Sequence, residues 1–154
     1  MVGFFNRNQP QAGGLQGYAG TVESILTTAG VDVMSARMQT ETGYGWTFVR
    51  GSATIEVYVS EQDGVGYFQA LSPIIHLPAN GLLPLYRRLL ELNLQLTNAA
   101  IGIHEDKVYL FSERPLDGLD GNEANAIINL VSGYADDLDD KLIAEFGGRL
   151  YSRI

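Results

Sequence analysis

The sequence contains no cysteine and only two histidines, His76 and His104, among its 154 residues. Without cysteine the chain forms no disulfide, offers no thiolate ligand to zinc and has no cysteine nucleophile. A zinc site built on histidine needs several further ligands at suitable spacing, and neither histidine has such companions in the sequence. The sequence therefore predicts no metal site, and no motif in it indicates a cofactor.

Long apolar runs and an excess of basic residues are also missing. No run approaches the roughly 20 apolar residues of a membrane span, and the start of the chain lacks the pattern of a signal peptide. The net charge is −8, from 18 acidic and 10 basic residues. Nucleic-acid-binding proteins normally carry the opposite sign because they neutralise phosphates. We therefore expect a cytoplasmic protein that binds neither membrane nor nucleic acid.

Catalytic motifs are likewise missing from the sequence. There is no G-x-S-x-G nucleophile elbow, and the glycines near the start are not followed by the Lys-Ser/Thr of a phosphate-binding loop. Residues 117–123 resemble half of a calcium loop, but the carboxylate spacing is wrong and Asp120 with Glu123 reads as a helix capping box. We therefore expect no enzyme.

What the sequence does contain is enough apolar residues for one globular domain, since 45% of the chain is hydrophobic. The first 20 residues differ, because they are rich in Gly, Asn and Gln and have too little apolar surface to offset the entropy of ordering. We expect a flexible arm at residues 1–20 and a single domain at residues 21–154.

The domain begins with a short amphipathic helix, after which the hydrophobic period changes from helical spacing to strict alternation. The helix is expected at residues 22–29, and strands near residues 33–40, 44–50, 53–60 and 66–72. Gly51-Ser52 between two alternating runs predicts a hairpin with a type II′ turn. The turn sets the register, so Trp46 faces Val57 on an apolar side that we assign to the core.

A second helix, a second hairpin and a long third helix follow. The second helix begins near residues 80–83 and carries so broad an apolar arc that we expect it to contact either another helix or another subunit. The hairpin turns at Glu105-Asp106, which pairs Ile103 with Val108. The third helix starts at the capping box of Asp120 and runs for about 25 residues, far enough to cross a whole sheet. The predicted fold is α+β: an antiparallel sheet of about six strands with three helices, in the order α-β-β-β-β-α-β-β-α.

This order of elements, with LLELN at residues 89–93 and SERPL at residues 112–116, resembles the YbjN-like family, described as sensory transduction regulators. That family is similar to the type III secretion chaperone fold, of which the Tir chaperone family is the better understood branch. The resemblance implies no reaction. For the chaperones it implies a homodimer that wraps an unfolded stretch of a partner over apolar patches and strand edges.

One face of the predicted sheet is a candidate binding surface. If the helices cover only the other face, an apolar and aromatic surface remains, formed by Val49, Tyr58, Tyr109 and Phe111. Such a surface usually marks a contact with a partner or a dimer contact. The alternative is that a helix covers this face too and makes these residues a second core layer.

An acidic run on the last helix is a second candidate. Asp136, Asp137, Asp139 and Asp140 lie opposite the apolar stripe of the helix. The simpler interpretation is a solvent-exposed polar face, and the more specific one is a binding site for a basic segment of a partner.

These observations lead to two hypotheses of different classes. The first is a non-enzymatic module, chaperone-like or regulatory, that binds a protein or peptide segment by strand addition and apolar contact and acts as a homodimer. The second is a small-ligand sensor with a pocket between the sheet and the last helix.

Overall fold

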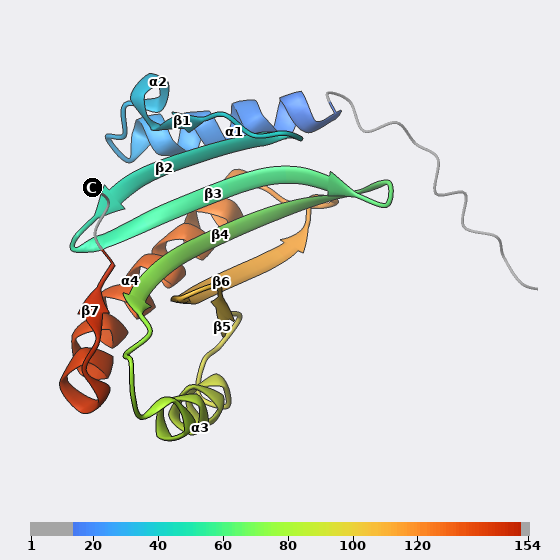
Figure 1. The fold of residues 1–154 in the computed structure, drawn as a ribbon. Coiled ribbons are helices and arrows are strands. Elements are labelled where there is room, and N and C mark those ends of the chain that lie inside the picture. The colour runs from blue at the N-terminus through green and yellow to red at the C-terminus, as the bar shows by residue number, and fades with distance from the viewer. Residues whose placement is uncertain (1–13, 152–154) are drawn as a thin grey trace, which may run out of the picture.

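The computed structural model describes residues 14–151, and the strands within that range form one curved antiparallel sheet (Figure 1). The strand order is β1-β2-β3-β4-β6-β5, and β7 pairs with the end of β4. The strands are β1 (Arg37–Met38), β2 (Tyr44–Arg50), β3 (Ala53–Gln62), β4 (Val65–His76), β5 (Ala100–His104), β6 (Lys107–Pro115) and β7 (Arg149–Leu150).

Helices cover one face of this sheet. They are α1 (Gly14–Thr28), the one-turn α2 (Val33–Ala36), α3 (Leu82–Asn93) and α4 (Gly121–Phe146). Helix α4 runs behind β3 and β4 along most of their length, with α1 beside its first half and α3 beyond β5 (Figure 1). The predicted α+β architecture is confirmed, with four helices in the described residues rather than three.

The registers of both predicted hairpins are confirmed. Trp46 pairs with Val57 across β2 and β3, and Ile103 pairs with Val108 across β5 and β6. Gly51 has a φ of 62°, the positive value that the first central residue of a type II′ turn requires. Alternation of side chains along each strand therefore places the same residues on each face as the sequence predicted.

The buried face of the sheet and the inner side of α4 form the core. Trp46 and Phe68 contribute the largest fully buried side chains of the sheet, and α4 packs Ile128 and Leu142 onto it. Burying one large apolar side chain contributes about 1.5–3 kcal/mol, so this layer accounts for much of the driving force for folding. Trp46 also donates a hydrogen bond from Nε1 to Oε1 of Glu23 on α1, at 3.2 Å.

The prediction of a strand at residues 33–40 is wrong for residues 33–36. Residues 33–36 form α2, because the Asp32 carboxylate accepts hydrogen bonds from the backbone N–H groups of Met34 and Ser35 and so caps a helical turn. Only Arg37–Met38 then pair with β2.

The first helix begins earlier than predicted, at Gly14 instead of residue 22. Residues 14–20, which we placed in the arm, form its first half because Leu15, Tyr18 and Ala19 continue the apolar side of the helix and pack on the core. That packing outweighs the low helix propensity of the glycines. Residues 1–13 of the predicted arm lie outside the described residues.

Candidate functional site

The face of the sheet opposite the core has no described helix on it. Along β3, Ala53, Ile55, Val57 and Val59 are buried against the helices, whereas the alternate residues from residue 56 onward are only half-buried. The same alternation continues on β6. The helices of residues 14–151 therefore all pack against a single face.

We call the exposed surface the open sheet face and define it by Glu56, Tyr58, Leu71, Tyr109 and Phe111. Cross-strand pairing places Leu71 between Glu56 on β3 and Phe111 on β6. The Tyr58 hydroxyl donates to Oε2 of Glu56 at 3.0 Å. Burial, followed by the nearby charge of Glu56, raises the pKa of Tyr58 above its usual range, and the same two causes raise the pKa of Tyr109.

Three of the four residues predicted for this surface lie in one region. Tyr58, Tyr109 and Phe111 surround Leu71. Val49 lies on β2 with β3 and β4 between it and β6, and its side chain is 66% exposed. Sequence reasoning missed Leu71, although its place in the alternation of β4 was a usable signal.

The four aspartates of the last helix do not form one surface. Asp136 accepts hydrogen bonds from the hydroxyl and the backbone N–H of Ser52, at 2.6 and 3.3 Å, and Asp139 is 6% exposed beside the same hydroxyl. The β2–β3 turn thus occupies both carboxylates, and only Asp137 and Asp140 remain on the outer side of α4. Burial raises the pKa of Asp139, whereas the hydrogen bonds from Ser52 lower the pKa of Asp136.

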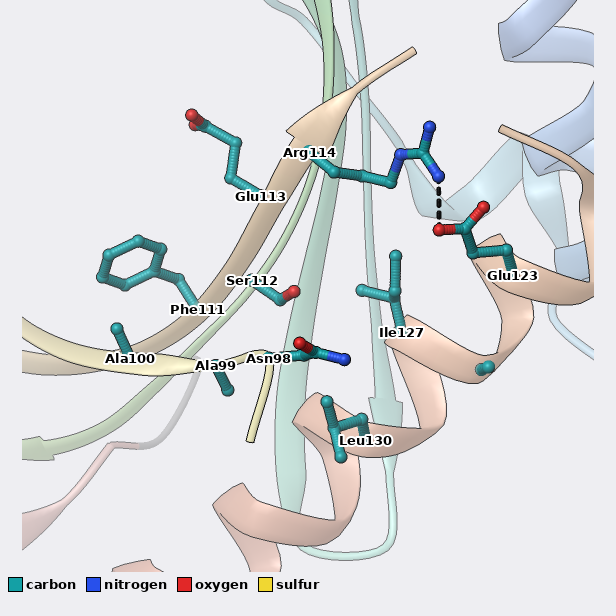
Figure 2. Close-up of a pocket in the computed structure, with 11 residues that line it drawn as sticks. Asn98, Ala99, Ala100, Phe111, Ser112, Glu113, Arg114, Glu123, Ile127 and Leu130 are labelled. Atoms are coloured by element: carbon teal, nitrogen blue, oxygen red, sulfur yellow. Dashed lines mark ion pairs between the residues drawn. The ribbon is translucent and has the colours of Figure 1, made fainter. Parts of the chain in front are cut away.

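A groove of about 650 Å³ opens between β6 and the first half of α4 (Figure 2). We call it the β6-edge groove, because β5 pairs with β6 only as far as Ala100 opposite Phe111 and leaves the rest of β6 beside the groove. Its apolar walls come from both elements: Ala99 and Ala100 on the sheet side, and Ala126, Ile127 and Leu130 on α4. Phe111 borders the groove, but its ring points away from α4 (Figure 2). The second hypothesis placed a pocket in this region, between sheet and last helix.

An ion pair closes one end of the β6-edge groove. Arg114 on β6 reaches across to Glu123 on α4, and its guanidinium also donates to the backbone carbonyls of Pro115 and Asp117, at 2.7 and 2.6 Å (Figure 2). The predicted capping box is therefore only half formed. The Asp120 side chain accepts from the Glu123 backbone N–H at 2.8 Å, but the Glu123 carboxylate pairs with Arg114 instead of turning back.

Comparison with solved structures identifies the architecture. The chain shares the fold of the type III secretion chaperones. A chain of the ExsC–ExsE complex matches 83% of this chain over 95% of its own length, with a TM-score of 0.65 and 12% identity. A chain of the HopA1–SchA chaperone–effector complex matches 86% over 99%, with a TM-score of 0.60 and 7% identity. A chain of the Yersinia pestis chaperone SycH in complex with a stable fragment of YscM2 matches 82% over 98%, with a TM-score of 0.51 and 15% identity.

These likenesses establish the chaperone-like fold and nothing finer, because the identities are low. No family model matches the sequence, and no curated protein matches it. The resemblance to the YbjN-like family therefore has no support beyond the shared fold.

Helix α3 of this chaperone-like fold has two apolar sides. Leu85, Leu89 and Leu92 are buried in the core. On the opposite side Leu83, Leu90 and the C-cap residue Leu94 are 80%, 68% and 89% exposed, and we call these three residues the α3 leucine face. At about 100° per residue they form one narrow stripe. Within one copy of the chain, therefore, only one side of the broad apolar arc predicted for this helix is buried.

The remaining polar groups form no metal centre in the described part of the chain. No three ligating side chains of residues 14–151 come together. His76 has its Nδ1 2.9 Å from Oδ2 of Asp106, and His104 lies beside the Tyr109 ring. Among the described residues no helix has the length and apolar character to cross a membrane.

Proposed function

We propose that this chain is a non-enzymatic, chaperone-like or regulatory module that works as a homodimer and holds a segment of a partner protein on its open sheet face. The observation that carries the proposal is that face itself: half-buried aromatic side chains lie on a sheet that no described helix covers there. The cytoplasm stays the expected compartment.

The chemistry of the open sheet face suits a protein partner. Tyr and Phe are enriched at protein interfaces because a flat ring covers much apolar area at a small cost in side-chain entropy. Tyr58 and Tyr109 add hydroxyl groups to an apolar centre at Leu71, so the surface offers a partner segment both apolar contacts and hydrogen-bonding groups.

The likeness to solved chaperones supports the same conclusion. All three matched structures are protein complexes, and two of these complexes contain a protein called a chaperone. The α3 leucine face supports the proposal of a homodimer. Exposure of three leucines in one helical stripe to water is unfavourable for a monomer, and a second copy would bury them.

Capture from a lysate with the protein immobilised tests the proposal. The double variant Tyr58→Ser, Tyr109→Ser should lose the partner that the wild type retains, because it removes both rings and keeps the strands. Val49→Ser is the matched control, since it changes an exposed residue on the same side of the sheet away from the cluster. Retention of every partner by a double variant with a wild-type circular dichroism spectrum would refute the binding face.

A small-ligand sensor remains the second candidate, because the β6-edge groove has a volume within the range of ligand pockets, about 300–1,000 Å³. A thermal-shift screen over metabolites tests it. Ligand binding to the folded state raises the melting temperature by mass action, so one metabolite should give a concentration-dependent rise. Ala126→Arg, which places a long side chain in the groove, should abolish that rise.

A further inference from the structure

We infer that the β6-edge groove binds an uncharged aliphatic molecule whose head group both donates and accepts hydrogen bonds, as a carboxamide does, with Ser112 and Asn98 as the residues that bind this head group. The inference rests on the second candidate function, the small-ligand sensor, and assigns the chemical class of its ligand.

The Ser112 hydroxyl is a largely buried polar group that no described residue hydrogen-bonds. Ser112 lies on β6 opposite the buried Ala70, so its side chain faces α4, and the residue is 7% exposed. By contrast, the hydroxyl of Ser72 on the neighbouring strand donates to the Thr54 carbonyl at 2.8 Å. No polar side-chain atom within residues 14–151 is both fully enclosed and unpaired, so the Ser112 oxygen opens to the groove that it lines. A ligand that covers the groove has to hydrogen-bond this oxygen, because enclosing a hydroxyl without a partner is unfavourable.

Asn98 supplies a second polar group with free hydrogen-bonding capacity. It lines the same groove, and Figure 2 shows its carboxamide and the Ser112 hydroxyl both directed toward α4. Within residues 14–151 no group hydrogen-bonds this carboxamide. A hydroxyl and a carboxamide each donate and accept hydrogen bonds. Together they complement a ligand head group that does both.

The charged residues around the groove indicate that the ligand is neutral. Arg114 and Glu123 pair with each other, and the guanidinium also donates to two backbone carbonyls. Glu113 points away from α4 and accepts a hydrogen bond from the side-chain amide of Gln69 (Figure 2). A charged ligand would therefore lose its hydration without gaining an ion pair in the groove, which is unfavourable.

The walls of the groove complement an aliphatic chain. The α4 residues that line it extend from Glu123 to Leu130, which is about 10 Å along the helix axis. Ile127 and Leu130 are half-buried and face alanines across the groove, so a linear apolar chain would cover aliphatic surface on both sides. Removal of this surface from water favours binding.

Titration of the isotope-labelled full chain with octanamide, followed in amide NMR spectra, tests the inference. Octanamide should shift the signals of residues around the groove in a saturable way. Octanoate and octylammonium carry a similar chain with a charge of either sign, and acetamide carries the head group without the chain. Each of these three compounds should bind at least tenfold more weakly than octanamide.

Ser112→Ala separates a binding role of the hydroxyl from a structural one. It should weaken octanamide binding about tenfold, the effect of one lost hydrogen bond, and leave the melting temperature unchanged because the free protein loses no hydrogen bond. Ser72→Ala is the matched control. It removes the bond to the Thr54 carbonyl, so it should lower the melting temperature and leave octanamide binding unchanged.

Three further variants locate the ligand. Asn98→Gly keeps the positive φ of 52° at this position and should weaken octanamide binding several-fold. Ala126 is exposed on α4 inside the groove, so Ala126→Arg should fill the groove without disturbing the core and weaken binding at least tenfold. Ala144→Arg, at an exposed position of the same helix outside the groove, is the matched control and should bind like the wild type.

The inference is overturned if octanamide gives no saturable shifts, if octanoate or octylammonium binds as tightly, or if Ser112→Ala binds like the wild type. It also fails if a peptide of residues 1–13 displaces octanamide, or if Ala126→Arg halves the mass in solution, because the occupant is then this chain itself or a second copy.

Failure of this inference is distinguishable from failure of the proposed functions. If octanamide does not bind but a metabolite raises the melting temperature of the wild type and not of Ala126→Arg, the sensor function survives with a ligand of another class. Partner capture on the open sheet face is independent of both results, because Tyr58 and Tyr109 lie outside the groove.

Discussion

The Ser52 hydroxyl donates a hydrogen bond to Oδ1 of Asp136 at 2.6 Å, and this contact fixes the tip of the β2–β3 hairpin to the middle of α4. The two residues are 84 positions apart in the sequence. A Cβ atom at Gly51 would lie 3.2 Å from the same carboxylate oxygen, so the turn and the helix are also close in space there. The contact therefore couples the position of the long helix to the register of the first hairpin.

We predict that Asp136→Ala lowers the melting temperature by a few degrees at neutral pH, because the turn loses a charged acceptor. The hydrogen bonds from Ser52 lower the pKa of Asp136 in the folded state. A lowered pKa contributes stability above the unfolded value, near 4, and this contribution is lost as the pH falls through the folded value. The difference in melting temperature between the wild type and Asp136→Ala should therefore become smaller at acidic pH.

Scanning calorimetry from neutral pH to below 4 checks this prediction, with roughly the unfolded pKa of aspartate as the turning point. Asp137→Ala is the control, since its side chain lies on the outer side of α4 and should change the melting temperature little. A gap between wild type and Asp136→Ala that stays constant with pH would contradict the assignment.

Trp46 should contribute more stability than any other position on β2. The side chain is fully buried and donates to Glu23, so Trp46→Ala should cost about 3–5 kcal/mol of unfolding free energy. Urea unfolding followed by far-ultraviolet circular dichroism measures the loss without relying on tryptophan emission. Val49→Ala, on the exposed side of the same strand, should change the free energy by about 0.5 kcal/mol or less. Equal costs for the two variants would place Trp46 outside the core.

Local patterns account for the parts of the fold that were predicted correctly. Alternating apolar residues around Gly51 determined the first hairpin, and the apolar runs around Glu105 and Asp106 determined the second. A slip of one residue would reverse the faces, so alternation excludes odd slips, and the position of the turn then fixes the register. The long helix followed from its apolar spacing and from the cap at Asp120.

The parts that were missed depend on contacts between distant segments. Asp139 follows the buried Ala135 by four residues, so helical spacing alone places it beside the apolar stripe. Only the docking of Ser52 separates Asp136 from Asp137. The β6-edge groove depends on where β5 starts, which the turn at Asn98 decides. The first half of α1 was missed because its helical structure depends on packing against the core rather than on propensity.

Tyr58 and Tyr109 should ionise late in an alkaline titration. Burial and Glu56 raise both pKa values, and unperturbed tyrosine ionises near 10. The unfolded state then loses its protons first as the pH rises, so the folded state loses stability above about pH 10. Spectrophotometric titration of the eight tyrosines should show a late fraction, and Tyr58→Phe should reduce that fraction. An unchanged late fraction in Tyr58→Phe would contradict the buried position of this hydroxyl.

The α3 leucine face makes the oligomeric state testable without disturbing the monomer. Leu90 and Leu94 are exposed, so Leu90→Lys with Leu94→Lys should leave the unfolding free energy of one copy within about 0.5 kcal/mol per site. Three exposed leucines in one stripe favour burial against the same stripe of a second copy related by two-fold symmetry. Light scattering coupled to gel filtration should therefore give the mass of two copies for the wild type and of one copy for the double variant.

Met34→Lys, at an exposed apolar position on α2, is the matched control and should keep the wild-type mass. A monomeric wild type, or a double variant that keeps twice the monomer mass, would show that the exposed leucines of α3 do not join two copies.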